Sequence, residues 1–129
     1  MRYSLCSIAS FVVCQALLLG VQGSAHAADE PVALIARFFA TPGREAEAEA
    51  RLLMTVAFVR KAEPSTTYRL YRSQKDPTVF VFYEIFQSLA TYEHHLKVTL
   101  PAFRKENGPP PEGLYVRPPE SETLQTLAN

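Results

Sequence analysis

The segment Val79–Phe86 constrains the fold most, because it combines the pattern of a β-strand with a carboxylate among aromatic side chains. Side chains alternate between the two faces of a strand, so Glu84 shares one face with three phenylalanines. These are Phe80, Phe82 and Phe86. A carboxylate in apolar surroundings is costly unless it is paired or protonated. The strand therefore predicts a partner for Glu84.

The nearest candidate partner in the sequence is His95, on a helix predicted from Leu89 to Lys97 with Ser88 as its N-cap. Neighbouring residues on a helix project in different directions, which puts His94 in solvent and His95 at the edge of an apolar face. His95 could act as a proton acceptor in a cleft between helix and sheet, or be a core-edge histidine held by a backbone carbonyl. Glu84 could orient His95 or have a purely structural hydrogen-bonding role.

The spacing of apolar residues in the rest of the chain predicts one further helix and three further strands. Proline at position 101 is expected to end or kink the histidine helix. The order is strand, helix, strand, strand, helix, strand, which is the ferredoxin-like split βαβ arrangement of an α+β protein. The expected strands are 32–40, 66–73, 79–86 and 114–117, and the expected helices are 44–62 and 89–97.

The second face of the strand 79–86 is also apolar, since Val81, Tyr83 and Ile85 point away from the phenylalanines. A strand that is apolar on both faces is usually covered on both sides. The chain has too few residues left to cover the second face, so we expect a homodimer.

The N-terminus resembles a cleaved export signal: a positive start at Arg2, an apolar run over 8–21 and the small-x-small pattern Ala25-His26-Ala27. The alternative is a membrane anchor, but a run of about 14 residues is shorter than the roughly 20 needed to span a bilayer. We therefore expect a signal peptide at 1–27, a domain at 28–119 and a C-terminal tail at 120–129. The mature protein would be periplasmic or secreted, with no membrane association.

Composition excludes several function classes for residues 28–129. Loss of the signal would remove both cysteines and Arg2, leaving no disulfide, no thiolate metal site and one excess negative charge. That balance argues against nucleic acid as a partner. Three glycines cannot form a glycine-rich phosphate loop, and no G-x-S-x-G motif is present. Redox chemistry would come from the substrate itself or from a non-covalently held group such as haem.

Residues 36–103 resemble the antibiotic biosynthesis monooxygenase family, which includes quinol monooxygenases. The resemblance rests on the order and spacing of several short pieces rather than on one motif. They are an apolar strand leading into Pro42-Gly43, an acidic helix ending in 60–64, the run 68–73, Asp76-Pro77, the run 80–84, and His95-Leu96 followed by Pro101-Ala102-Phe103.

The resemblance implies a ferredoxin-like protomer that pairs into a dimeric α+β barrel, and oxidation of a small quinol or polyphenol by molecular oxygen without a metal or a cofactor. His95 would be the catalytic base and Glu84 its partner. Residues expected to bind substrate are Arg72, Tyr92, Phe82 and Phe86. Two alternatives remain open: a non-enzymatic dimer that binds a hydrophobic ligand or haem, and a structural dimer whose tail docks another protein.

Overall fold

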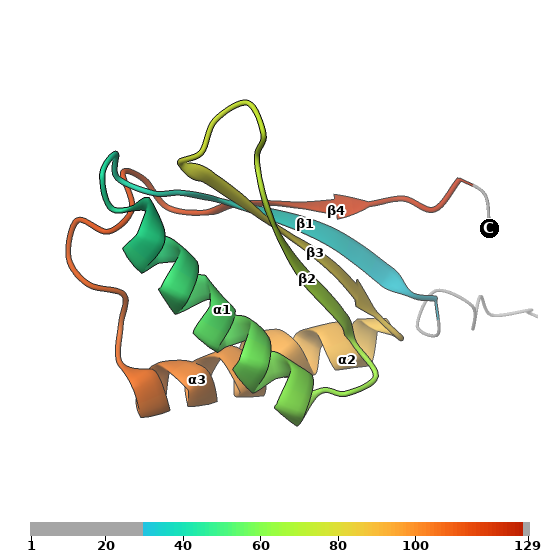
Figure 1. Cartoon of the computed structure of the whole chain (residues 1–129). Coiled ribbons are helices and arrows are strands. Elements are labelled where there is room, and N and C mark those ends of the chain that lie inside the picture. Colours follow the sequence, from blue (N-terminus) through green and yellow to red (C-terminus); the bar gives the residue numbers. More distant parts are fainter. Residues whose placement is uncertain (1–29, 128–129) are drawn as a thin grey trace, which may run out of the picture.

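A computed structural model describes residues 30–127 (Figure 1). The chain forms a four-stranded antiparallel sheet with its helices on one face, in the order β1–α1–β2–β3–α2–α3–β4. This confirms the predicted ferredoxin-like α+β protomer. The predicted signal peptide, residues 1–27, lies outside the described residues. Within residues 30–127, no helix is both long and apolar enough to cross a membrane.

The centre of the sheet is formed by β1 (Val32–Phe39) and β3 (Val79–Phe86), with β2 (Thr67–Arg72) on the other side of β3. Burial in β3 alternates residue by residue, and the three phenylalanines and Glu84 are on the buried face. The antiparallel register places Leu34 and Tyr68 opposite Glu84, one on each neighbouring strand. The carboxylate thus lies in the middle of the sheet.

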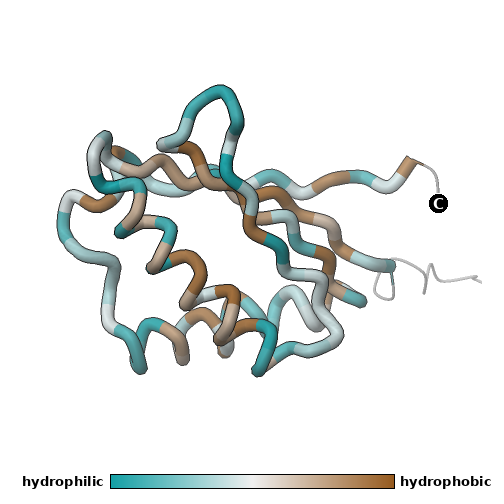
Figure 2. The backbone as a smooth tube through the Cα atoms, in the orientation of Figure 1, coloured by the Kyte–Doolittle hydropathy of each residue, from teal (hydrophilic) through white to brown (hydrophobic). Residues whose placement is uncertain are grey.

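The helix α1 (Glu45–Ala62) packs against this face through a stripe of small and branched side chains. Its buried residues are Ala48, Leu52, Val56 and Val59. Figure 2 shows hydrophobic residues along the central strands and a hydrophilic loop between β2 and β3. The core therefore lies between the sheet and the helices.

The second helical region is longer than predicted. It starts as α2 (Leu89–His94), passes through a wide π-helical turn at His95–Thr99, and continues as α3 (Leu100–Asn107). Ser88 caps α2 as expected, because its side chain accepts a hydrogen bond from the Thr91 amide. Pro101 does not end the helix: it follows the π-helical turn and lies in the first turn of α3, where a missing N–H is tolerated.

The predicted last strand, 114–117, is wrong. That segment makes one isolated bridge, between Tyr115 and Ala40, and buries Leu114 completely. The edge strand is β4 (Glu120–Leu124), which pairs with β1 after the two prolines at 118–119. Its side chains are all exposed, so it lacks the hydrophobic alternation that identifies a strand in a sequence. Residues 120–124 therefore belong to the sheet and not to a separate tail.

The opposite face of the sheet is not covered by any described helix (Figure 1). Val81, Tyr83 and Ile85 point to this face and are half-buried. Arg37 also points there and pairs with Glu122 of β4 at 3.7 Å.

Candidate active site

A buried histidine between two buried carboxylates is the centre of the candidate site. His95 is 1% exposed, Glu84 3% and Glu63 9%. Nδ1 of His95 lies 3.0 Å from Oε2 of Glu63, which is hydrogen-bonding distance. Nε2 of His95 lies 4.0 Å from Oε2 of Glu84, too far for a direct hydrogen bond. The structure thus brings Glu84 and His95 together and adds Glu63.

Three structural elements position the His95 ring. The π-helical turn at His95–Thr99 forms a backbone bond from the Leu100 amide to the His95 carbonyl, and it buries both His95 and Thr99. Phe86 on β3 and Tyr68 on β2 then pack against the imidazole, with ring centroids 4.9 Å and 5.5 Å away. π-helical turns occur often at functional sites. The aromatic contacts restrict rotation of the imidazole.

Sequence reasoning did not single out Glu63. It follows α1 directly, where its amide bonds to the Val59 carbonyl, and it precedes Pro64. It is 32 residues from His95 in the sequence, at the C-terminal end of a different helix. A charged residue between a helix end and a proline usually lies at the surface, so only the tertiary packing of α1 against the π-helical turn shows its role.

Burial sets the protonation states of this cluster. It lowers the pKa of His95, although the charge and the hydrogen bond of Glu63 act in the opposite direction. It also raises the pKa of Glu84 to about 8, and repulsion from Glu63 adds to this rise. Burial therefore favours the neutral imidazole of His95 and the protonated carboxyl of Glu84.

The hydrogen bond to Glu63 fixes which imidazole nitrogen carries the proton. An ionised carboxylate accepts but does not donate, so with Glu63 in that form Nδ1–H donates to it and Nε2 keeps its lone pair. Oε2 of Glu84 is buried and has no hydrogen-bond partner among the described residues. Because Oε2 and Nε2 are 4.0 Å apart, a ligand hydroxyl oxygen at about 2.8 Å from each would contact both.

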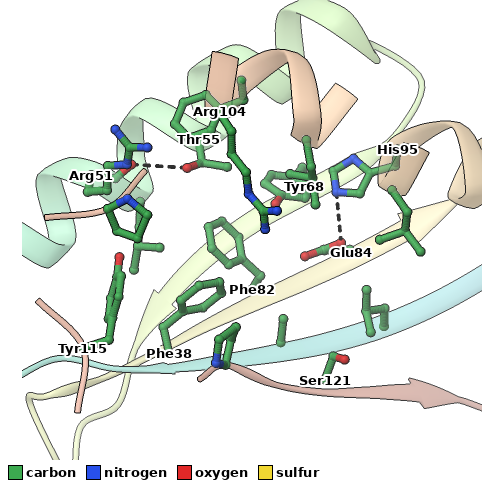
Figure 3. Close-up of a pocket in the computed structure, with 18 of the residues that line it drawn as sticks. Phe38, Arg51, Thr55, Tyr68, Phe82, Glu84, His95, Arg104, Tyr115 and Ser121 are labelled. Carbon is green, nitrogen blue, oxygen red and sulfur yellow. Dashed lines mark hydrogen bonds and ion pairs between the residues drawn. The ribbon is translucent and has the colours of Figure 1, made fainter. Parts of the chain in front are cut away.

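His95 and Glu84, but not Glu63, line a cavity of about 350 Å³ between the sheet and the helices (Figure 3). Its wall is mainly apolar, with polar groups from His95, Glu84, Tyr68, Arg51 and Arg104. An apolar cavity of about 150 Å³ is enough to bind benzene, so this one has room for one or two aromatic rings. Its further lining includes Leu34, Phe38, Leu52, Tyr92, Leu96, Leu100, Phe103 and Tyr115.

The four predicted substrate-binding residues lie in different places. Phe82 and Tyr92 line the cavity. Phe86 does not line it and packs against the rings of His95 and Tyr92.

The fourth residue, Arg72, does not line the cavity. It donates to the Pro77 carbonyl and pairs with Glu49 at 3.3 Å. It lies four residues along β2 from Tyr68, roughly 13 Å away at the usual strand rise. The cations that do line the cavity are Arg51 and Arg104, from the helices.

The family model for antibiotic biosynthesis monooxygenases matches residues 31–105, more than half of the chain. The chain belongs to this family. The match covers β1 through most of α3 and includes all three residues of the buried cluster. The sequence resemblance to antibiotic biosynthesis monooxygenases is thereby confirmed.

Solved structures show the same fold as this family member. A Caulobacter crescentus protein assigned to the antibiotic biosynthesis monooxygenases superimposes with a TM-score of 0.63 at 24% identity, covering 78% of this chain and 92% of that one. PA3566 from Pseudomonas aeruginosa superimposes with a TM-score of 0.60 at 28% identity, covering 77% of this chain and 96% of that one. SnoaB from Streptomyces nogalater, described as a cofactor-independent oxygenase, superimposes with a TM-score of 0.56 at 19% identity. The superposition covers 78% of this chain and 96% of SnoaB. No curated protein matches the sequence.

Proposed function

We propose that this protein is a cofactor-independent monooxygenase that oxidises a small quinol or polyphenol with molecular oxygen. The observation that carries the proposal is the imidazole of His95, held by Glu63 at Nδ1 and aimed with Nε2 toward an apolar cavity. Family membership supports an oxygenase, and the description of SnoaB supports one that works without a cofactor.

The proposed reaction begins with proton transfer. A quinol hydroxyl binds near Nε2 of His95, which accepts its proton, and the buried charge of Glu63 stabilises the resulting imidazolium. The quinol anion then transfers an electron to oxygen, and the two radicals combine at a ring carbon. Cleavage of the O–O bond leaves one oxygen atom on the ring and releases the other as water. The overall change is quinol plus O₂ to hydroxyquinone plus H₂O.

The protein has two further roles in this scheme. The apolar wall excludes water, which strengthens the interaction between His95 and Glu63. Protonated Glu84 can donate a hydrogen bond to the substrate oxygen as negative charge develops there. This scheme gives Glu63 the role of orienting His95, which the sequence analysis considered for Glu84 beside a purely structural role.

Oxygen uptake tests the proposal, using residues 28–129 treated with a chelator and a panel of reduced quinols. We expect uptake above autoxidation for at least one quinol, and a loss of about 10²-fold or more in His95→Ala. His94→Ala is the matched control, since His94 is exposed on the neighbouring position of the same helix. Equal rates in wild type and His95→Ala would refute the catalytic role, and binding without uptake would indicate a ligand-binding protein.

We also propose that the protein forms a homodimer through the face of the sheet that its own helices leave uncovered. Val81, Tyr83 and Ile85 supply the apolar surface, and β3 then has cover on both sides. The dimeric barrel implied by the family resemblance would result from this pairing.

Export remains a proposal from the sequence. The pattern at 1–27 predicts removal of that segment and a periplasmic or secreted product. N-terminal sequencing of the protein from an expressing bacterium should begin at Ala28, and an intact Met1 terminus would contradict export.

A further inference from the structure

Arg104 is a cation directed into the cavity without a partner among the described residues. It lies on α3 and lines the cavity, and Figure 3 shows its guanidinium pointing toward the middle of the pocket. Some of the other arginines have carboxylate partners, as Arg44 has Glu47 and Arg72 has Glu49, whereas Arg60 bonds only to the Tyr68 carbonyl. No hydrogen bond or ion pair is formed by Arg104 within residues 30–127.

A second cation lies on the same side of the cavity. Arg51 of α1 donates to the backbone carbonyls of Asn107 and Gly108 and stacks 4.7 Å from the centre of the Phe103 ring. These partners are neutral, so none of them compensates the positive charge of Arg51. The acidic residue that lines the cavity is Glu84, so two arginines face one carboxyl group whether or not that group is ionised. The cavity wall thus carries a net positive charge.

The charges and the proton acceptor occupy different parts of the cavity. In Figure 3, His95 and Glu84 lie at one side, Arg51 and Tyr115 at the opposite side, and Arg104 between them. A flat ring with its hydroxyl at His95 would extend toward the arginines. A guanidinium binds a carboxylate through two parallel hydrogen bonds, which makes it the side chain of choice for that group.

We propose that the substrate is an aromatic acid: a phenol or quinol whose ring carries a carboxylate, which binds Arg104. The assignment of the hydroxyl to His95 rests on the proposed oxygenase function, whereas the carboxylate at Arg104 rests on the pocket alone. Arg51 adds to the positive potential at that end of the ring.

Binding of a matched ligand pair tests this proposal without any turnover. The ligands are 6-hydroxy-2-naphthoate and 2-naphthol, which differ only in the carboxylate, and their Kd values are measured by calorimetry at low salt. We expect the wild type to bind the naphthoate about tenfold more tightly. The preference should fall to about onefold in Arg104→Gln, remain partly in Arg104→Lys, and shrink at high salt.

Lys105→Gln is the matched control, because it removes the same charge from the next position of α3, outside the cavity lining. It should keep the preference for the naphthoate. Equal binding of the two ligands by the wild type, a preference retained in Arg104→Gln, or binding of neither ligand would each overturn the proposal. A carboxylate preference without oxygen uptake would support this inference and refute the oxygenase, so the two failures are distinguishable.

Discussion

At the residue scale, the central feature is the hydrogen bond between His95 and Glu63, which the local sequence of neither residue predicts. The alternation of β3 and the helical periodicity around His95 were enough to predict that Glu84 and His95 face the same space. The contact with Glu63 depends on how α1 packs against the π-helical turn, and no local pattern encodes that distance. Arg72 lies away from the cavity, and the sequence around an arginine on a strand does not indicate its distance along the sheet from a cavity.

The raised pKa of Glu84 predicts a stability that falls as the pH rises. The folded protein holds the Glu84 proton up to about pH 8, whereas an unfolded chain releases it near 4.5. The neutral carboxyl therefore favours folding below about pH 4.5, and this contribution is lost as the pH rises through 8. The free energy of unfolding falls by on the order of a few kcal/mol over this pH range.

Glu84→Gln tests this titration, because glutamine mimics the protonated carboxyl at every pH. Urea unfolding should show the variant gaining free energy of unfolding relative to wild type between pH 5 and pH 9. The comparison cancels the titration of other groups, and Glu49→Gln, at a half-exposed carboxylate, controls for the loss of a surface charge. A difference between wild type and Glu84→Gln that stays constant with pH would contradict the assignment.

At the scale of elements, the local sequence patterns predicted the helices better than the edge strand of the sheet. The predicted N-cap at Ser88 placed the start of α2 correctly, and the apolar periodicity placed α1. The strand β4 was not predicted, because its side chains are exposed and only its backbone pairs with β1. The π-helical turn also has no sequence pattern that separates it from an ordinary helix.

The cap of α2 makes a measurable contribution to stability. Ser88→Ala removes the side chain that accepts from the Thr91 amide, and we expect a loss of about 1 kcal/mol in the free energy of unfolding. Ser65→Ala is the control, since Ser65 is exposed, and its effect should stay within about 0.5 kcal/mol. An equal effect of the two substitutions on chemical denaturation would contradict a capping role.

At the scale of the whole molecule, a small domain leaves one face of its sheet without cover. About 100 residues supply one core, here between the sheet and the helices, and the other face stays half-buried. The proposed dimer follows from that face. The cavity lies on the helical side, so each protomer would contain a complete set of the residues described here.

A charge on the uncovered face should separate the proposed dimer. Ile85→Lys places an ammonium among the apolar side chains of β3, and sedimentation at micromolar concentration should show monomers. Lys75→Glu, in the exposed loop between β2 and β3, should leave the dimer intact. A wild-type protein that sediments as a monomer would refute the dimer, as would an Ile85→Lys variant that stays dimeric.

The central claim is that His95 enables a quinol to take an oxygen atom directly from O₂, and isotope labelling tests it most directly. Chelator-treated protein is supplied with ¹⁸O₂ and a quinol that supports uptake, and the product is analysed by mass spectrometry. We predict one ¹⁸O atom in each hydroxyquinone, with labelling reduced to the autoxidation background in His95→Ala. A product that carries no ¹⁸O, with oxygen recovered as hydrogen peroxide, would contradict a monooxygenase.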